Sequence, residues 1–335
     1  MRFAWRASLQ ARRRGAFNLV TDATPRVFQT SGSVWLKDFE FGLTGLTVRK
    51  TGARVPYSPT IISQVTAWFR YFFAAKAIAP LEPRFTIFFT PERARPWYLI
   101  FSVSRAAGAK LAKDASQADV VMQFEDATYS PNDPPAKVKP GAKLVNFNCR
   151  DVSKSNVSRA CAAAFGNPLA VDPATFTGLA VEKSEINAAH DGHIVQCPAT
   201  PVPGRVYQRV VDNRTHADLN LVEDLRTCTI GGKPVCVFIK RREVTKRFLN
   251  TNTEVLLRTP EEVFSREEMD QISAFTREIG LDWGGVDVLR DRNDGKLYIV
   301  DANKTDMGPP IGLNLQDKIK ATYMLRDAFR KFVLG

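Results

Sequence analysis

Two aspartates on adjoining short segments are the residues with the clearest chemical use. Asp287 lies in the segment Gly285–Arg290, and Asp301 lies in the segment Lys296–Ala302. Both segments alternate in the manner of strands, and Asp294-Gly295 between them is a strong hairpin signal. Because each aspartate is seven residues from Asp294, the hairpin is predicted to set the two carboxylates opposite each other.

This pair indicates a metal site. Two carboxylates that face each other across a hairpin repel and weaken it, and a divalent cation reverses the effect. Asn303 follows Asp301 by two residues and shares its face, because side chains alternate along a strand. Two carboxylates and an amide oxygen suit Mg²⁺, which usually shares phosphate oxygens. A solvated polar face without an ion is the alternative, and Gly284-Gly285 together with the apolar opposite face favours the metal.

A helix is predicted to lead into the hairpin. Ser265 and Glu268 form a capping box, in which each side chain bonds the other's backbone N–H. Gly280 ends the helix. An apolar stripe lies between these signals: Met269, Ile272, Phe275 and Ile279.

Short apolar runs alternate with helical stretches between residues 85 and 150. Strands are predicted at Phe85–Phe89, Val120–Phe124 and Leu144–Phe147, with a helix from about Trp97 to Ala115. This alternation is typical of a parallel, doubly wound α/β unit. The proline-rich stretch Asp126–Gly141 is predicted to be a surface loop.

A second α+β region follows, so three parts are expected: an N-terminal extension over 1–84, an α/β domain over 85–150 and a third region over 151–335. The further strands expected in the third region are Gly178–Glu182, Arg205–Val211, Leu225–Ile230 and Val235–Arg241.

The net charge of +12 is concentrated at the start of the chain. Residues 1–80 carry twelve Lys and Arg against three acidic residues, whereas the remainder is nearly neutral. The aromatic stretch Ile61–Ala79 contains charged residues and falls short of the ~20 apolar residues of a membrane span. Burial as a helix against the next domain is favoured, and contact of residues 1–80 with an anionic lipid surface is the alternative. No nucleic-acid-binding motif accompanies these basic residues.

The five cysteines indicate a reducing compartment. They are odd in number and form no C-x-x-C pair, so they suit neither a disulfide framework nor a structural zinc site. No apolar run follows the first arginines as a signal-peptide core would. A cytoplasmic location is expected, with a membrane-peripheral location as the alternative.

The order of motifs over residues 151–310 resembles that of the ATP-grasp superfamily, and is similar to the glutamate-adding ligases that modify a ribosomal protein. The segments that carry the resemblance are D-x-R at 224–226, I-G-G-K-P-V at 230–235, K-R-R at 240–242, Asn250 and Asn252, the stretch 279–290, and Asp301-x-Asn303. The resemblance implies an α+β ATP-grasp fold. In that fold a small doubly wound domain precedes a two-subdomain ATP-grasp domain, with a lid at about 170–210, which clasps nucleotide between sheets. It also implies that Asp287, Asp301 and Asn303 hold the metal, with Asp301 in place of the usual Glu.

The resemblance further implies a nucleotide site. Segments 151–154 and 180–183 resemble those of the two nucleotide-binding lysines, and 206–211 resembles the hinge strand whose main chain contacts adenine. Asp212 is the expected partner of the ribose. The loop 184–193 lacks the family's glycines, and its side chains are expected to donate to phosphate instead. The implied nucleotide-binding residues are Lys154, Lys183, Asn187, His190, Gln208, Arg209, Val210, Val211 and Asp212.

The activity implied by the resemblance is ATP-dependent ligation of a carboxylate to an amine through an acyl phosphate. Mg²⁺, or Mn²⁺ in its place, is the expected ion, and Arg226 with Arg241 or Arg242 is expected to stabilise the transferred phosphoryl group. The carboxylate and amine substrates are not identified. The alternatives are a phosphotransferase with a non-carboxylate acceptor, and a catalytically weak, membrane-peripheral nucleotide-binding protein.

Overall fold

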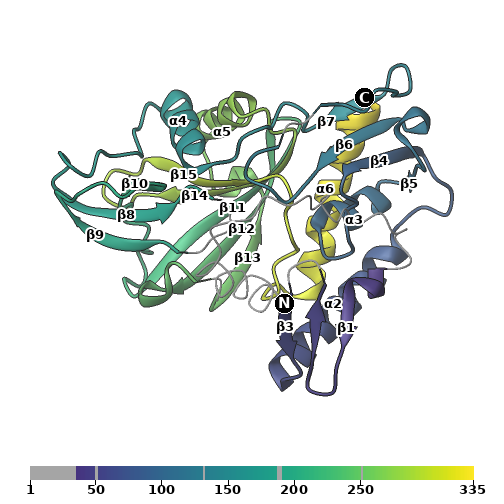
Figure 1. Ribbon diagram of the computed structural model, residues 1–335, viewed down its shortest axis with the longest axis horizontal. Coiled ribbons are helices and arrows are strands. Elements are labelled where there is room, and N and C mark those ends of the chain that lie inside the picture. Colours follow the sequence, from purple (N-terminus) through teal and green to yellow (C-terminus); the bar gives the residue numbers. More distant parts are fainter. Residues whose placement is uncertain (1–34, 50–51, 131–132, 187–190, 250–251) are drawn as a thin grey trace, which may run out of the picture.

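The computed structural model describes residues 35–49, 52–130, 133–186, 191–249 and 252–335. The strands of these residues form one parallel sheet and three antiparallel sheets. Figure 1 shows the parallel sheet and the three-stranded β8–β10 sheet at opposite ends, with a five-stranded sheet between them. The predicted α/β class is therefore confirmed.

The parallel sheet has the strand order β5-β4-β6-β7. Its strands are β4 (Phe85–Pro91), β5 (Ala109–Leu111), β6 (Val120–Phe124) and β7 (Lys143–Val145), and α3 (Leu99–Ala106) connects the first two. The helix predicted over Trp97–Ala115 is too long. Gly108 has a φ of +93°, which glycine adopts without the strain that a side chain brings, so the helix ends there and the chain returns as β5.

The third predicted strand of this region is also wrong in extent. Instead of Leu144–Phe147, β7 ends before Asn146, which has a φ of +65°. The Asn146 side-chain oxygen accepts from the N–H groups of Asp282 and Trp283, at 3.0 and 2.9 Å. β7 ends early because the Asn146 side chain hydrogen-bonds the backbone at the start of β14 (Trp283–Arg290) instead of continuing the strand.

The described part of the N-terminal extension is a small antiparallel sheet and a helix, which lie below the parallel sheet in Figure 1. The sheet comprises β1 (Phe39–Phe41), β2 (Gly45–Val48) and β3 (Ala53–Pro56). The helix is α2 (Pro59–Ala77), and it packs along one side: the Tyr71 hydroxyl lies 3.0 Å from that of Thr322. The predicted burial of this helix is therefore found on one side only, because Phe73 on the opposite side is 60% exposed. Within the described ranges, no helix is both long and apolar enough to span a bilayer.

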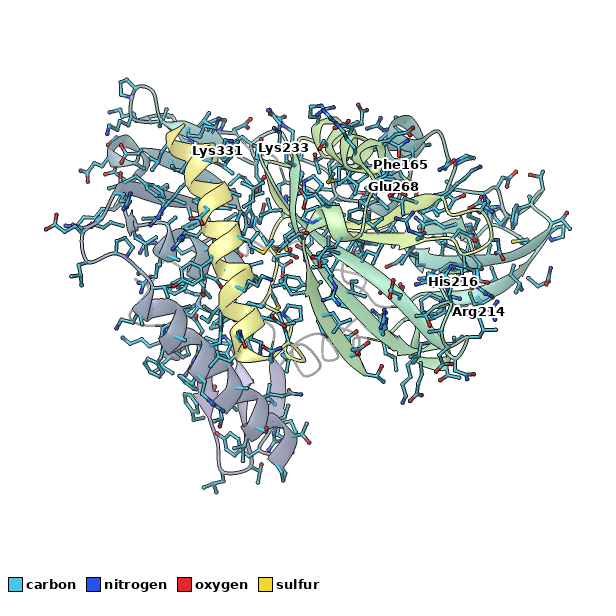
Figure 2. The ribbon with its side chains drawn as sticks, turned by 180° about the vertical axis from the view of Figure 1, so that it is seen from behind. Phe165, Arg214, His216, Lys233, Glu268 and Lys331 are labelled. Atoms are coloured by element: carbon cyan, nitrogen blue, oxygen red, sulfur yellow. The ribbon has the colours of Figure 1, made fainter. Side chains whose placement is uncertain are left out.

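The five-stranded sheet has the order β13-β12-β11-β14-β15 and lies between two helical layers. Its other strands are β11 (Leu221–Ile230), β12 (Lys233–Glu243), β13 (Glu254–Arg258) and β15 (Leu297–Asn303). One face packs on the C-terminal helix α6 (Leu315–Leu334), which also covers the parallel sheet. Seen from behind in Figure 2, α6 runs beside the sheet, and the Phe332 ring near its end lies against Gly231 in the β11–β12 turn.

The opposite face of this sheet packs on α4 (Lys154–Phe165) and α5 (Arg266–Glu278). Both hydrogen bonds of the predicted capping box are present, from the Ser265 and Glu268 side chains, and Gly280 follows the helix with a φ of +69°. The three-stranded sheet has the order β10-β8-β9, with β8 (Gly178–Ser184), β9 (His193–Cys197) and β10 (Arg205–Arg209). The strand predicted over Arg205–Val211 therefore ends two residues early.

The hairpin of β14 and β15 has the predicted pairing, and a bulge produces it. Near the turn, Arg290 pairs with Leu297 and Val288 with Ile299. The register then shifts by one residue at Val300, so that Asp287 pairs with Asp301. Without the extra residue Asp287 would face Val300, because the register near the turn would continue unbroken.

Candidate active site

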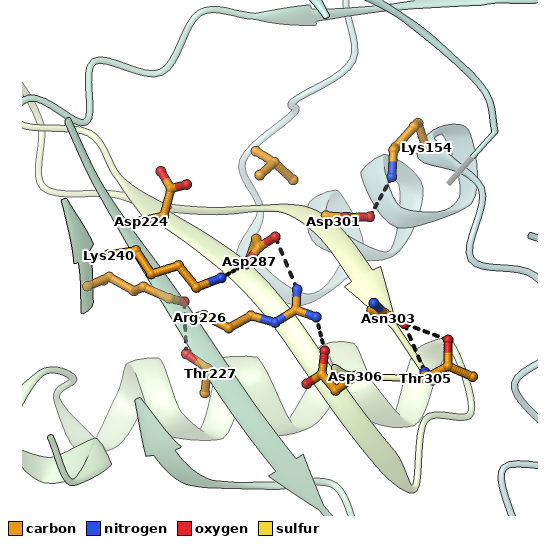
Figure 3. A network of polar contacts seen from close by, with 12 residues as sticks. Lys154, Asp224, Arg226, Thr227, Lys240, Asp287, Asp301, Asn303, Thr305 and Asp306 are labelled. Atoms are coloured by element: carbon orange, nitrogen blue, oxygen red, sulfur yellow. Dashed lines mark hydrogen bonds and ion pairs between the residues drawn. The ribbon is translucent and has the colours of Figure 1, made fainter. Parts of the chain in front are cut away.

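The face of the five-stranded sheet that packs on α6 changes from apolar to charged along its strands. Near the β11–β12 turn this face carries Cys228 and Phe238, which pack in the core. Further along the same strands the alternation places Arg226 on β11 and Lys240 on β12. Figure 3 shows these two cations beside Asp287 of β14. The charged cluster therefore lies on the face that packs on α6, further along the strands than the apolar residues.

Arg226 joins two carboxylates. Its Nη1 lies 3.1 Å from Oδ2 of Asp287, and its Nη2 donates to Oδ1 of Asp306. Arg226 and Asp306 are both almost completely buried. Burial opposes a charge on Arg226, but Asp287 and Asp306 outweigh it and raise the pKa of the guanidinium, so this group is a permanent cation.

Asp287 is ionised for the complementary reason. Burial favours its neutral form, but Arg226 and then Lys240, whose Nζ is 3.9 Å from Oδ1, lower the pKa of Asp287 well below the usual range. Asp287 Oδ1 is buried and makes no hydrogen bond with any residue in the described part of the chain. An ionised, buried oxygen without a hydrogen bond is costly, and Lys240 at 3.9 Å offsets only part of this cost, so the atom is suited to bind a metal ion as well.

Asp301 is bound by a lysine from a distant helix. Lys154 is the first residue of α4, which Ser153 caps, and its Nζ lies 2.5 Å from Oδ1 of Asp301. Lys154 is nearly buried, with 8% of its side chain exposed. The two facing aspartates are thus bound by different cations, which relieves their mutual repulsion.

Lys183 reaches the same place from β8. Its Nζ donates to the Val300 carbonyl at 3.2 Å, beside Asp301. Glu185, two residues further on, accepts from the N–H groups of Lys154 and Ser155 at the start of α4, which fixes the end of β8 there. Burial and then the charge of Lys154 lower the pKa of Lys183 to about 7.

The two carboxylates fit a divalent cation better than the amide does. Asp287 and Asp301 face each other, and Asp287 Oδ1 is the buried oxygen described above. The Asn303 oxygen, by contrast, already accepts from the N–H and the hydroxyl of Thr305, at 2.8 and 3.1 Å. No cluster of three or more His, Cys, Asp or Glu side chains that could hold a metal occurs within the described ranges. A divalent cation bound by these two carboxylates would need oxygens from outside the protein to complete its coordination, as is usual for Mg²⁺.

The structure separates the two arginines between which the sequence left the choice open. Arg242 lies on the charged face, where its Nη2 donates to Asp224. Arg241 points to the other face and pairs with Glu223 and Glu254, at 2.7 and 2.8 Å. Arg241 is therefore not brought together with Asp287.

The residues expected to contact the nucleotide base and ribose lie on β10 and just after it. Gln208 is buried and donates to the Ser158 hydroxyl at 2.8 Å, while the Arg209 guanidinium lies over the Tyr298 ring. Val210 is half-buried and Val211 packs in the core. Both oxygens of Asp212 accept from Arg214, at 2.8 and 2.7 Å. Asn187 and His190 lie outside the described residues.

Two charged residues of the cluster were given no role from the sequence, although one of them, Lys240, lies in the K-R-R segment that carries the resemblance. Lys240 could have been found, since it is two residues from Arg242 and strand alternation sets both on one face. Asp306 follows the last strand in an irregular segment, where no periodicity indicates a direction. Its place depends on how that segment packs, so the sequence carries no signal for it.

The comparisons with known proteins are distant. No protein-family model and no curated protein matches the chain. The chain is similar to the crystal structure of a RimK domain ATP-grasp protein from Sphaerobacter thermophilus, at 13% identity and a TM-score of 0.44, over 75% of this chain and 100% of that one. It is similar to the D-alanine–D-alanine ligase of Bacillus anthracis complexed with ATP, at 13% identity and a TM-score of 0.43, over 74% and 95%.

A third similar structure is the ATP-grasp ligase PsnB complexed with a minimal precursor. The identity is 12% and the TM-score 0.42, over 73% of this chain and 100% of that one. All three structures are less than 25% identical to this chain and have TM-scores below 0.5. The function proposed below therefore depends on the charged cluster of this chain itself.

Proposed function

We propose that the protein is an ATP-dependent ligase that joins a carboxylate to an amine through an acyl phosphate, as ATP-grasp ligases do. The observation that carries the proposal is the convergence of Lys154, Lys183 and Arg226 on the facing pair Asp287 and Asp301. Polyphosphate and a divalent cation need this combination, because the cations bind phosphate oxygens and the carboxylates bind the metal.

Each residue has a role that follows from its chemistry. Lys154 and Lys183 bind phosphate oxygens, and Arg226 with Arg242 stabilises the phosphoryl group during transfer to the carboxylate oxygen. Mg²⁺ held by Asp287 and Asp301, with Asn303 beside them, would supply neutralisation of charge on the phosphates. Transfer to a carboxylate needs positioning and charge stabilisation and no covalent nucleophile.

Acceptor-dependent release of ADP tests the proposal. Purified protein is incubated with Mg²⁺-ATP and pooled amino acids and carboxylates, and ADP, phosphate and new amide products are measured. ADP and phosphate released in equal amounts, and only when both substrates are present, are expected. A phosphorylated non-carboxylate product without phosphate release would identify a phosphotransferase, and AMP as the product would contradict the acyl-phosphate route.

Nucleotide binding is expected to take up a proton at alkaline pH. With a pKa of about 7, Lys183 is mostly neutral at pH 8 in the free protein. A nearby phosphate favours the charged form and raises this pKa, so Lys183 becomes protonated on binding. Calorimetry of a non-hydrolysable ATP analogue at pH 8, in buffers of different ionisation enthalpy, measures the uptake. It is expected to disappear in Lys183→Met, and equal uptake by this variant would assign the proton to another group.

The tip of the β1–β2 hairpin favours a second property, contact with an anionic bilayer. Phe41 is 60% and Leu43 fully exposed there. Arg54 donates to the Thr44 hydroxyl at 2.7 Å, which sets a positive charge beside the tip. An exposed apolar tip with a basic neighbour is suited to insertion among acidic headgroups.

Replacing Phe41 and Leu43 together with serine is therefore expected to weaken binding to phosphatidylserine vesicles at least about tenfold, from the lost burial of two large side chains. Co-sedimentation measures the change. The matched control is Leu81→Ser, which removes an equally exposed leucine beyond the far end of α2. Equal binding by the tip variant and the wild type would leave the tip without a role in membrane contact.

A further inference from the structure

Arg226 and Asp306 meet over a position of β14 that has no side chain, beside the direct cross-strand pair Arg226 and Asp287. Gly285 pairs with Cys228 and lies on the same face as Asp287, two residues before it. A Cβ at Gly285 would lie 2.7 Å from Arg226 Nε and would overlap Oδ2 of Asp306. The backbone at Gly285 is thus the surface over which the guanidinium and the Asp306 carboxylate meet.

The backbone of Asp306 is held by contacts with the parallel-sheet region. Its carbonyl accepts from Leu99 N–H at 2.8 Å, at the first residue of α3, and the next residue, Met307, forms a bridge with Tyr98. Asp306 is 4% exposed. Its carboxylate is therefore held by the contact between the parallel-sheet region and the segment that follows β15.

We infer that Asp306, together with the bare backbone at Gly285, is a positioning element that holds Arg226 for phosphoryl transfer. Asp306 binds Nη2 and leaves Nη1 toward Asp287, which fixes the plane of the guanidinium. Asp306 also supplies a second negative charge for Arg226, so that Asp287 does not neutralise this arginine alone. Because α3 holds Asp306, the orientation of Arg226 depends on the packing of the parallel-sheet region against the site.

Two substitutions probe this element from opposite directions. Asp306→Asn keeps the shape and removes the charge, whereas Gly285→Ala keeps the charge and obstructs the meeting point. If both act through Arg226, each is expected to lower kcat about 10²-fold, as a misplaced group does, with the KM for ATP within about threefold. The double variant is expected to lose much less than the product of the two single effects, because residues that act as a unit are not additive.

The matched control is Asp38→Asn. Asp38 is also 4% exposed and pairs with a buried arginine, Arg95, at 2.8 Å, but Asp38 lies just before β1 and Arg95 precedes α3, so neither residue is on the five-stranded sheet. Its variant reports the cost of losing a buried ion pair, read as a lower midpoint of thermal unfolding, with kcat unchanged. Equal loss of kcat in Asp38→Asn and Asp306→Asn would reduce Asp306 to a stabilising residue and overturn the inference.

The kinetic readout rests on the proposed ligase activity, so crystal structures of the nucleotide-free variants provide a separate one. In Asp306→Asn the Arg226 guanidinium is expected to turn and lose its present contact with Asp287 Oδ2. An unchanged pose overturns the inference whatever the activity. A changed pose upholds it even if the wild type hydrolyses no ATP, a result that would contradict the proposed function alone. If Asp306→Asn does not fold, Gly285→Ala is judged by the same two criteria.

Discussion

Asp301→Ala is expected to reduce acceptor-dependent ADP release by at least about 10³-fold, comparable to the loss of a preorganised charge-stabilising group. The variant removes one of the two facing carboxylates proposed to hold the metal. It also removes the ion-pair partner of Lys154, 2.5 Å away. Both the metal and a phosphate-binding lysine lose their position, so the effect is expected in kcat and in nucleotide affinity together.

Asp294→Ala is the control for this prediction. Asp294 lies at the turn of the same hairpin, where its carboxylate is exposed and bonds only locally, to the Lys296 N–H at 3.0 Å. Activity is expected to stay within about twofold of wild type, as for a surface substitution away from the site. Wild-type turnover in Asp301→Ala would contradict the metal assignment, whereas loss in both variants would indicate a damaged hairpin.

Arg226→Met is expected to lower the free energy of unfolding by about 3–5 kcal/mol at pH 7, because removing one partner of a buried ion pair leaves a buried charge uncompensated. Here two carboxylates, of Asp287 and Asp306, lose the same guanidinium. The deficit is expected to shrink on acidification. The lowered pKa of Asp287 stabilises the wild type at pH values above about 3.9, the pKa of this group in the unfolded state. This stabilisation is lost as the pH falls toward the lowered pKa.

Urea unfolding measures this change, and Arg241→Met is the matched control. Arg241 also joins two carboxylates, of Glu223 and Glu254, but its side chain is 31% exposed, against 6% for Arg226. Such pairs contribute about 0–1 kcal/mol each, so a small loss is expected. Adding Asp306→Asn to Arg226→Met is expected to recover part of the stability. A loss in Arg226→Met no larger than that in Arg241→Met would show that solvent or a neighbour compensates the buried carboxylates.

Local features of the fold could be predicted because their causes are local. The capping box of α5, the glycine after it and the Asp294-Gly295 turn each depend on residues a few positions apart, and all are present. Errors occurred where a distant contact ended an element, as at Asn146, whose side chain binds the backbone of residues 282 and 283. Strands β9 and β13 were not predicted, and their pairing with β8 and β12 is what defines them.

Residue spacing alone places Asp287 and Asp301 on the two strands of one hairpin. That they face each other depends on the bulge at Val300, which no local pattern in the sequence indicates. The sequence also located the excess charge outside this region, in the first eighty residues. The hairpin follows from spacing along one short stretch of chain, and the charge distribution follows from composition alone.

The packing of distant elements, and not spacing along the chain, brings particular cations to these carboxylates. Lys154 is 147 positions from Asp301, and Arg226 is 80 positions from Asp306, so no local pattern relates either pair. The tertiary structure also selected Arg242 over Arg241 for the charged face and brought in Asp306 through a backbone contact with α3. The physical reason is that these charged residues lie on different elements, which come together only when the layers of the fold pack. The packing of the layers is driven by the burial of apolar faces that are far apart in the sequence, and not by the spacing of residues within one element.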